Sequence, residues 1–416
     1  MHAIEKIFAK AAGKPRVAAG EIVNCRVDLA GINDLYLQTI RSFREMGGKQ
    51  VHDPRGVVVF LDHYAPASTI MQAENQKQFR EFCREQGIDL LMDIDQGVCH
   101  QVLVDRGLIR PGMILVVTDS HTTTHGAFGA FGTGVGATDL ATILISGELW
   151  FRVPEIIRIH LTGKLKKGVF AKDIILKIIG DLGADYGVYK AIEFTGPVLA
   201  NLSVSERMAL CNMTTELGAK TSYIQPDHIT LQYLVEKQVR DFEIIETDPG
   251  YQYAAEHTYD VSGIGPQVAA PSSVDNVSAV SDLLGVPIDQ AFLGTCTGGR
   301  VPDLAVAAKI LKGKHISPRT RLVVVPASKR VLLEAIHLGY IQTLVEAGAT
   351  LVTPGCAACL GTHQGMLAAD ERCITSSSRN FPGRMGHSQA EIYVASPASV
   401  AAAALEGKIV DPREYV

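Results

Sequence analysis

The sequence has 416 residues, of which 47% are hydrophobic and 20% are charged, and its formal net charge is -5. This length predicts two or three domains, and the residue balance is that of a compact α/β enzyme, which excludes a disordered or fibrous chain. There is no long run of Lys and Arg and no apolar stretch of about 18 residues, so we expect neither nucleic acid nor a membrane as a partner. A small molecule is the expected ligand.

The N-terminus predicts an amphipathic helix, with apolar residues at positions 4, 7, 8 and 11, and lacks the apolar core of a signal peptide. We therefore expect a cytoplasmic protein whose thiols stay reduced. Four of the eight cysteines lie inside apolar periodic segments, where a small buried side chain is expected. These are Cys25, Cys83, Cys211 and Cys373.

Helices and strands alternate in the first third of the chain. We predict strands over 21–29, 56–61 and 113–118, and helices over 35–46, 69–86 and 138–150. Such alternation indicates βαβ units with a parallel sheet covered on both faces. The glycine-rich stretch 126–136 lacks the G-x-G-x-x-G register behind a strand, so close helix packing explains its glycines as well as a dinucleotide loop does.

After Pro154 the predicted elements become shorter, which indicates a smaller second lobe. It contains strands over 156–161 and 189–194 and helices over 171–182 and 203–218. The Gly/Pro/Ser-rich passage 265–273 predicts the next boundary. A third lobe follows, with strands near 291–294, 321–325, 350–353, 373–376 and 391–395 and a helix over 303–311.

Reactive side chains follow five of the predicted strands. They are Asp62 and His63, then Asp119 and His121, then Cys296, then Cys356 and Cys359, and finally Arg379 and Arg384. Open parallel sheets bind ligands at the carboxyl ends of their strands. The sequence therefore predicts one shared site.

Three cysteines are candidate metal ligands. Two lie in the tight turn Thr353-Pro-Gly-Cys-Ala-Ala-Cys-Leu-Gly361, and the third is Cys296. Zinc modules typically use two closely spaced pairs, whereas one lone Cys and a distant C-x-x-C fit an iron-sulfur cluster better. A redox dithiol at Cys356 and Cys359 is a third reading, but it leaves Cys296 unexplained. Three thiolates on a four-iron cluster would leave one iron open, as a Lewis-acid catalyst requires.

Three histidines could each be a satisfied core residue when taken singly: His63, His100 and His121. Together with Asp62 and Asp119 they indicate acid/base pairs in which a carboxylate orients an imidazole.

Two arginines, Arg379 and Arg384, bracket a turn after the strand near 373–376. Alone they would be surface charges on a solvated loop, but guanidinium groups suit bidentate recognition of carboxylates. They indicate a di- or tricarboxylic acid as the substrate.

Six motifs spread over the chain carry a family resemblance. They are Val117-Thr-Asp-Ser-His-Thr122, Gly97-Val-Cys-His-Gln101, Cys211-Asn-Met-Thr-Thr-Glu216, Gly294-Thr-Cys-Thr297, Pro354-Gly-Cys-Ala-Ala-Cys-Leu-Gly361 and Arg379-Asn-Phe-Pro-Gly-Arg-Met-Gly386. Together they resemble the aconitase superfamily, specifically the separate large subunit of the 3-isopropylmalate dehydratase and homoaconitase branch. The expected fold is three α/β/α-type lobes with mostly parallel sheets around a central iron-sulfur site, at 1–154, 155–270 and 271–416.

The resemblance implies a role for each motif residue. Cys296, Cys356 and Cys359 would hold a 4Fe-4S cluster whose free iron takes the substrate hydroxyl and one carboxylate. His63, paired with Asp62, would protonate the departing hydroxyl. A surrounding proton network would comprise His100, Asp119, His121 and Glu216. Arg379 and Arg384 would clamp a carboxylate, and Asn33 would lie near the substrate.

The implied reaction is dehydration and rehydration of a hydroxy di- or tricarboxylate, foremost the isomerisation of 2-isopropylmalate to 3-isopropylmalate in leucine biosynthesis. Alternatives within this class are 2,3-dimethylmalate and homoaconitate or homocitrate. The chain reaches only to Val416, after the third lobe, so the resemblance implies a separate small subunit that carries the swivelling domain and a serine base. An RNA-binding iron sensor is disfavoured by the lack of a basic face, and a zinc-stabilised structural protein predicts zinc and no chromophore.

The chain departs from the family pattern close to the expected cluster. The resemblance puts Asn212, Gly298 and Ser378 around it, and the last two stand where the family usually has asparagines whose amides bond cluster sulfides. The loss of two amide donors predicts a more labile cluster or a divergent branch with another substrate.

Overall fold

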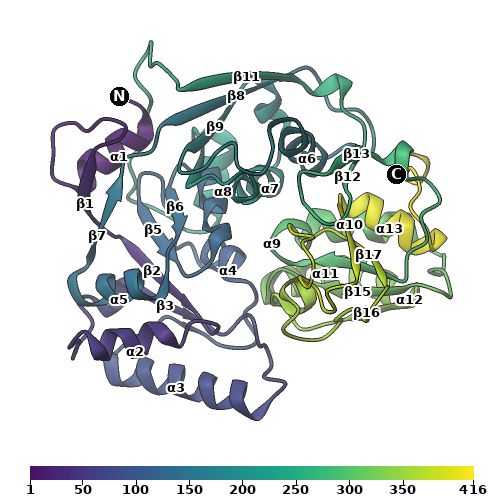
Figure 1. Ribbon diagram of the computed structural model, residues 1–416, viewed down its shortest axis with the longest axis horizontal. Coiled ribbons are helices and arrows are strands. Elements are labelled where there is room, and N and C mark those ends of the chain that lie inside the picture. The colour runs from purple at the N-terminus through teal and green to yellow at the C-terminus, as the bar shows by residue number, and fades with distance from the viewer.

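A computed structural model describes all 416 residues of the chain. Three large sheets of five, four and seven strands follow one another along the sequence, and a two-stranded ribbon accompanies the first. Figure 1 shows the first two sheets and their helices next to one another, with the C-terminal sheet across from them and α4 and α9 facing the region between. None of the helices is long and apolar enough to cross a membrane.

The first sheet has the strand order β4-β3-β2-β5-β6, and every neighbouring pair is parallel. Its strands are β2 (Leu29–Asn33), β3 (Val57–Phe60), β4 (Leu91–Met92), β5 (Ile114–Val117) and β6 (Phe131–Gly134). Its helices are α1 (Ala3–Ala11), α2 (Gln38–Glu45), α3 (Ile70–Gln86), α4 (Cys99–Asp105) and α5 (Ala137–Ser146). Val57 and Val59 belong to one core cluster and Val58 and Phe60 to another, so both faces of the sheet are covered, as its continuous apolar strands predict.

Three predicted elements differ from the structure. The helix predicted over 203–218 is α7 (Val204–Asn212) followed by a 3-10 helix over Met213–Leu217. The strand predicted over 21–29 is two strands, because β1 (Ile22–Arg26) leaves the parallel sheet and pairs antiparallel with β7 (Glu148–Arg152). The helix predicted over 138–150 stops at Ser146, since Gly147 takes a left-handed conformation with φ +76° and β7 begins directly after it.

The second sheet is entirely parallel, with the order β10-β9-β8-β11. Its strands are β8 (Ile156–Thr162), β9 (Ala191–Thr195), β10 (Thr221–Ile224) and β11 (Ala255–Asp260). The accompanying helices are α6 (Ala171–Leu182), α7 (Val204–Asn212) and α8 (His228–Glu236). The largest buried apolar cluster includes Val58, Ile157 and Cys296, so it joins side chains of all three predicted lobes.

The C-terminal sheet has the order β13-β12-β18-β17-β14-β15-β16. Its strands are β12 (Gln267–Ala269), β13 (Val277–Ala279), β14 (Gln290–Gly294), β15 (Arg321–Val325), β16 (Ala349–Leu351), β17 (Arg372–Thr375) and β18 (Glu391–Ala395). Its helices are α9 (Thr295–Gly298), α10 (Val301–Leu311), α11 (Lys329–His337), α12 (Tyr340–Glu346) and α13 (Pro397–Glu406). The predicted boundary passage 265–273 contains β12, which pairs antiparallel with β13 and β18.

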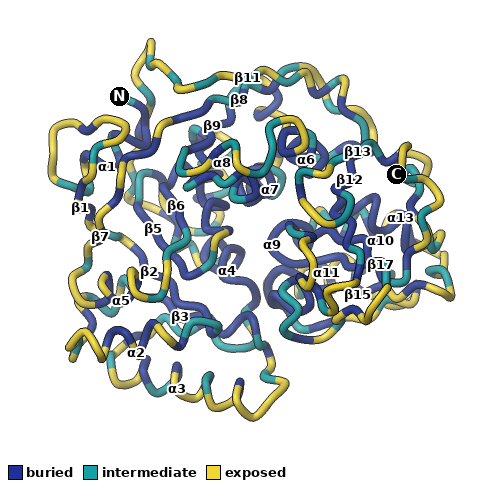
Figure 2. Tube along the Cα trace, in the orientation of Figure 1, coloured by how far each residue is buried: buried dark blue, intermediate teal, exposed yellow.

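Burial follows the same plan. Figure 2 shows buried segments lining the centre of the molecule, where the first and the C-terminal sheets face one another, and exposed segments on the outer turns of α3. The four cysteines expected to be small buried side chains, Cys25, Cys83, Cys211 and Cys373, are all buried and form no disulfide.

Candidate active site

The predicted site residues converge because several parallel strands end at the centre of the molecule. Asp62 and His63 follow β3, and Asp119 follows β5. From the C-terminal sheet, Cys296 follows β14 and Cys356 lies beyond β16. Members of both groups line one small cavity of about 80 Å³. Its lining includes His63, His100, Asp119, His121, Cys296, Cys356, Cys359, Arg379 and Arg384.

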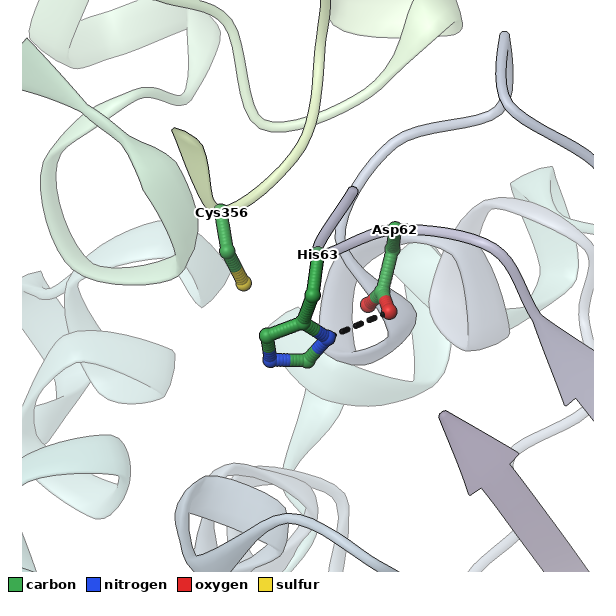
Figure 3. A group of neighbouring side chains, drawn as sticks. All are labelled: Asp62, His63 and Cys356. Carbon is green, nitrogen blue, oxygen red and sulfur yellow. Dashed lines mark hydrogen bonds and ion pairs between the residues drawn. The ribbon is translucent and has the colours of Figure 1, made fainter. Parts of the chain in front are cut away.

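The Asp62–His63 pair is built into the end of β3. His63 Nδ1 lies 2.8 Å from Asp62 Oδ1, and both side chains are buried. The Asp62 carboxylate also accepts hydrogen bonds from Asn33 Nδ2 at 3.0 Å and from the backbone N–H of Cys99 at 2.9 Å. Figure 3 shows Nδ1 of the imidazole turned to Asp62, with Cys356 on a separate segment of chain. The carboxylate is saturated by neighbours and therefore orients the ring.

Opposing effects set the charge of His63. Burial disfavours the imidazolium, but the Cys356 sulfur and the carboxylates of Asp62 and Asp119 outweigh burial and raise the pKa of His63 well above its usual value. Its Nε2 lies 3.6 Å from Asp119 Oδ2. The His63 imidazole is therefore protonated before a reaction begins and suited to act as an acid.

Asp119 is the hub of a second group. Its carboxylate lies 3.2 Å from His100 Nε2 and 3.4 Å from His121 Nδ1, and it accepts the backbone N–H of His121 at 2.8 Å. Burial works against its charge, but the neighbouring imidazoles of His100, His121 and His63 hold the pKa of Asp119 well below its usual value. One carboxylate thus joins three imidazoles around the cavity.

The far side of His121 reaches the C-terminal sheet. Its Nε2 lies 2.9 Å from Glu216 Oε1 and 2.9 Å from Ser378 Oγ. Arg379 donates from Nε to Glu216 Oε2 at 3.0 Å and from Nη2 to Ser120 Oγ at 2.9 Å. Arg379 is therefore held in place by protein groups before any ligand binds.

The three predicted ligand cysteines are buried and line the cavity together. Two other groups of possible metal donors lie close by, each with its donor atoms within 4.8 Å of one another: Asp62, His63 and Cys356, and Cys99, His100 and Asp119. One lone cysteine with a distant C-x-x-C turn fits an iron-sulfur cluster better than a zinc module, which typically uses two closely spaced pairs.

Two residues next to these cysteines have a strained backbone. Thr295, before Cys296, has φ +65°, and Ala357, after Cys356, has φ +48°. Non-glycine residues in this region cost about 1–3 kcal/mol each and cluster at functional sites. The chain accepts this strain where it aims two thiols into the cavity.

Few donors reach the sulfurs. Asn212 donates from Nδ2 to Cys296 Sγ at 3.3 Å, and Arg384 Nη2 lies 3.7 Å from Cys359 Sγ. Gly298 leaves no room for the family's asparagine, since a Cβ there would lie 2.3 Å from the Ser376 side chain. The hydroxyl of Ser378 is directed to His121.

The structure adds residues that the sequence did not single out. Asp34 accepts the backbone N–H groups of His63 and Tyr64, and it lies directly after β2, where the strand-end rule could have found it. Asn33 was expected near the substrate, but it is fully buried and bonded to Asp62 and Thr118. Asn33 does not line the cavity itself, whereas its partner Thr118 does.

His125 lies outside the six motifs and was not singled out from the sequence. It lies 5.7 Å from the His100 ring, and neither of its ring nitrogens has a hydrogen-bond partner. Burial lowers its pKa well below the usual value, which favours a neutral ring.

Comparisons with known proteins agree over the whole chain. The model of the aconitase family (aconitate hydratase) matches residues 5–285 and 280–407. The chain is 49% identical to a protein named 3-isopropylmalate dehydratase large subunit 1 from Methanopyrus kandleri, over 99% of both chains. It is 46% identical to a probable methanogen homoaconitase large subunit from Methanothermobacter thermautotrophicus, over 100% of this chain and 98% of that one.

A solved structure supports the fold. The holo-form of aconitase X from Thermococcus kodakaraensis superimposes with a TM-score of 0.51 at 14% identity, covering 91% of this chain and 90% of the other.

Proposed function

Since this chain belongs to the aconitase family, we propose that it is the large subunit of an iron-sulfur hydro-lyase that interconverts 2-isopropylmalate and 3-isopropylmalate in leucine biosynthesis. The relatives named 3-isopropylmalate dehydratase and their coverage of nearly the whole chain support this assignment. The observation that carries it is the single cavity that combines three buried thiols, three imidazoles and two guanidiniums.

Cys296, Cys356 and Cys359 would hold a 4Fe-4S cluster with one iron free of protein ligands. Their common cavity and the pairing of a lone cysteine with a distant C-x-x-C turn fit this group. When bound, the cluster supplies a Lewis acid for the hydroxyl and carboxylate of the substrate. The two donors to the sulfurs, Asn212 and Arg384, would support it.

His63 is the proposed acid for the departing hydroxyl. Asp62 holds its Nδ1, so the proton to be given away resides on Nε2, the nitrogen nearer to Asp119. Asn33 keeps the Asp62 carboxylate in place and thereby fixes the plane of the ring. We therefore assign Asn33 to the orientation of the acid and not to substrate contact.

The remaining imidazoles would share protons around Asp119. His100 and His121 both face this carboxylate, and His121 passes on to Glu216. A chain of this kind lets a proton move between the cavity wall and the second sheet without exposing the site to water.

The two arginines have different tasks in this scheme. Arg379 is held by Glu216 and Ser120, which gives a preorganised edge for one carboxylate. Arg384 is buried and makes no ion pair; its guanidinium lies over the Phe381 ring and reaches Cys359 Sγ, which leaves it without a carboxylate partner and suited to a bidentate substrate carboxylate.

The partner in this proposal is a separate small subunit that carries the swivelling domain and the serine base. The large-subunit names of the relatives support a two-chain enzyme. A hollow of about 550 Å³ adjoins the catalytic cavity and shares Tyr36, Thr118, Asp119 and Ser120 with it, so substrate and partner subunit could approach from this side.

Homoaconitase activity is the second candidate, because a relative with that name is 46% identical over the full length. The test is to co-express the chain with a small-subunit reading frame of the same genome, reconstitute it anaerobically with iron and sulfide, and assay 2-isopropylmalate against homocitrate. Turnover of 2-isopropylmalate supports the first assignment, and turnover of homocitrate alone replaces it.

The cluster is tested on the chain before any turnover is assayed. We expect about four irons per chain and a broad absorbance near ~400 nm, both lost in Cys359→Ser and kept in Cys373→Ser, whose thiol lies within β17. A colourless protein with about one zinc would overturn the hydro-lyase assignment.

A further inference from the structure

Lys172 is a buried cation without a carboxylate partner. It lies in the first turn of α6, is 2% exposed and forms no ion pair. Its Nζ donates to the carbonyl oxygens of Ser376 at 3.0 Å and Ser377 at 2.7 Å. A buried ammonium costs several kcal/mol unless its surroundings compensate it, so a lysine here needs a reason.

The carbonyls that Lys172 binds belong to the junction between two parts of the site. The Ser376 carbonyl also accepts from Thr297 Oγ1 at 2.8 Å, and its hydroxyl oxygen accepts from the backbone N–H of Gly294 at 2.9 Å. Gly294 and Thr297 flank Cys296 in the sequence. Lys172 therefore anchors the segment that holds the turn of the first cysteine.

The same segment leads directly into the proton network. Ser378 and Arg379 follow the two anchored carbonyls, and they bond His121 and Glu216. A shift of the segment would thus move a cluster ligand, a substrate arginine and the hydroxyl on His121 together.

The negative charge of the surrounding groups is a second reason for a lysine at this position. Burial lowers the pKa of Lys172 to about 8, and the groups that act in the opposite direction are the Cys296 sulfur, the Asp303 carboxylate, the Cys359 sulfur and the Glu216 carboxylate. Three thiolates in one buried cavity accumulate negative charge, which a fixed cation nearby offsets.

We propose that Lys172 is a positioning residue for the iron-sulfur site, which anchors the Ser376–Ser377 carbonyls and supplies a buried positive charge beside the turn of Cys296. The inference rests on the proposed function, because it concerns the group that Cys296, Cys356 and Cys359 would hold. Lys172 touches neither substrate nor thiol and acts through the backbone and its field.

The test is Lys172→Met in the full-length chain, reconstituted anaerobically. The matched control is Lys177→Met on the same helix, whose lysine is partly exposed and pairs with Asp181. We expect Lys172→Met to lose iron about tenfold faster under chelator and to show a more negative cluster reduction potential, since a positive charge has been removed. Lys177→Met is expected to leave both measurements unchanged.

The outcomes separate this inference from the proposed function. If the wild-type chain takes up no cluster, the proposed function fails. If the wild type carries the cluster but Lys172→Met keeps its potential and its iron, the positioning role is wrong. A purely structural lysine would lower thermal stability of the chain before reconstitution without moving the potential.

Lys172→Gln keeps one donor without the charge. It is expected to restore part of the iron retention but not the potential, which separates the hydrogen bonds from the field. If both Lys172→Met and Lys172→Gln fail to fold, the lysine is a folding element and the proposal is overturned.

Discussion

The two walls of the cavity differ in how many of their polar groups have hydrogen-bond partners within the protein. On the wall from the first sheet, Asp62 and Asp119 have their oxygens engaged by amides and imidazoles at hydrogen-bond distance. On the wall from the C-terminal sheet, three sulfurs share two donors, Asn212 and Arg384, and the backbone next to two of them is strained. The proton machinery is preorganised by the fold, whereas the thiol wall is built to be completed by a metal cluster.

The largest effect should come from the preorganised wall. Replacing His63 with Ala removes the proposed acid but leaves all three cysteines, so we expect kcat to fall about 10²- to 10⁴-fold with the visible spectrum and iron count unchanged. His160→Ala is the control, because that histidine lies on β8 and bonds Thr195 away from the cavity. Activity that survives in His63→Ala would mean that the leaving-group acid is misassigned.

Arg384 tests the thiol wall. Arg384→Lys keeps the charge but loses the planar pair of donors, so we expect KM to rise about tenfold, as the loss of a charged hydrogen bond worth ~1.5 kcal/mol implies. Steady-state kinetics on the two-subunit enzyme measures this. Arg372→Lys, in an exposed pair with Glu391, should leave KM unchanged. An unchanged KM in Arg384→Lys would remove Arg384 from carboxylate binding.

Asn33 tests whether the first wall works as one unit. Asn33→Ala withdraws amide donors from the buried Asp62 carboxylate, so we expect kcat to fall about tenfold and the free energy of unfolding to drop by ~1–3 kcal/mol. In a His63→Ala background the same change should add no further loss of kcat, because the ring it orients is gone. An equal loss of kcat in both backgrounds would show that Asn33 acts independently of His63.

The sequence predicted the strand ends well because parallel sheets impose a local rule. Each reactive residue follows its own strand, so Asp62, Asp119 and Cys296 could be grouped before their distances were known. Element bounds followed from local signals too, and the early end of the fifth helix at Gly147 was visible as a glycine. What the sequence could not contain is strand order: Asn33 meets Thr118 only because β2 lies next to β5.

The sequence also could not predict which residues contact the wall from the C-terminal sheet. Lys172 lies in an apolar helical segment, and nothing local connects it to carbonyls 204 and 205 residues away. The departures at Gly298 and Ser378 were visible, but their meaning depends on space and direction. Gly298 is required by the Ser376 side chain, and Ser378 points to a histidine.

Ser378 gives the smallest and most discriminating effect, because it belongs to the C-terminal segment but bonds the first wall. Ser378→Ala deletes one hydrogen bond to His121, so we expect kcat to fall about two- to tenfold, as ~0.5–1.5 kcal/mol implies, with iron release unchanged. Asn212→Ala should do the reverse, since it removes a donor to Cys296: iron release under chelator should rise about tenfold while His121 keeps its partners. If Ser378→Ala speeds iron release as Asn212→Ala does, the Ser378 hydroxyl supports the cluster. Ser378 then belongs to the thiol wall and not to the proton network of His121.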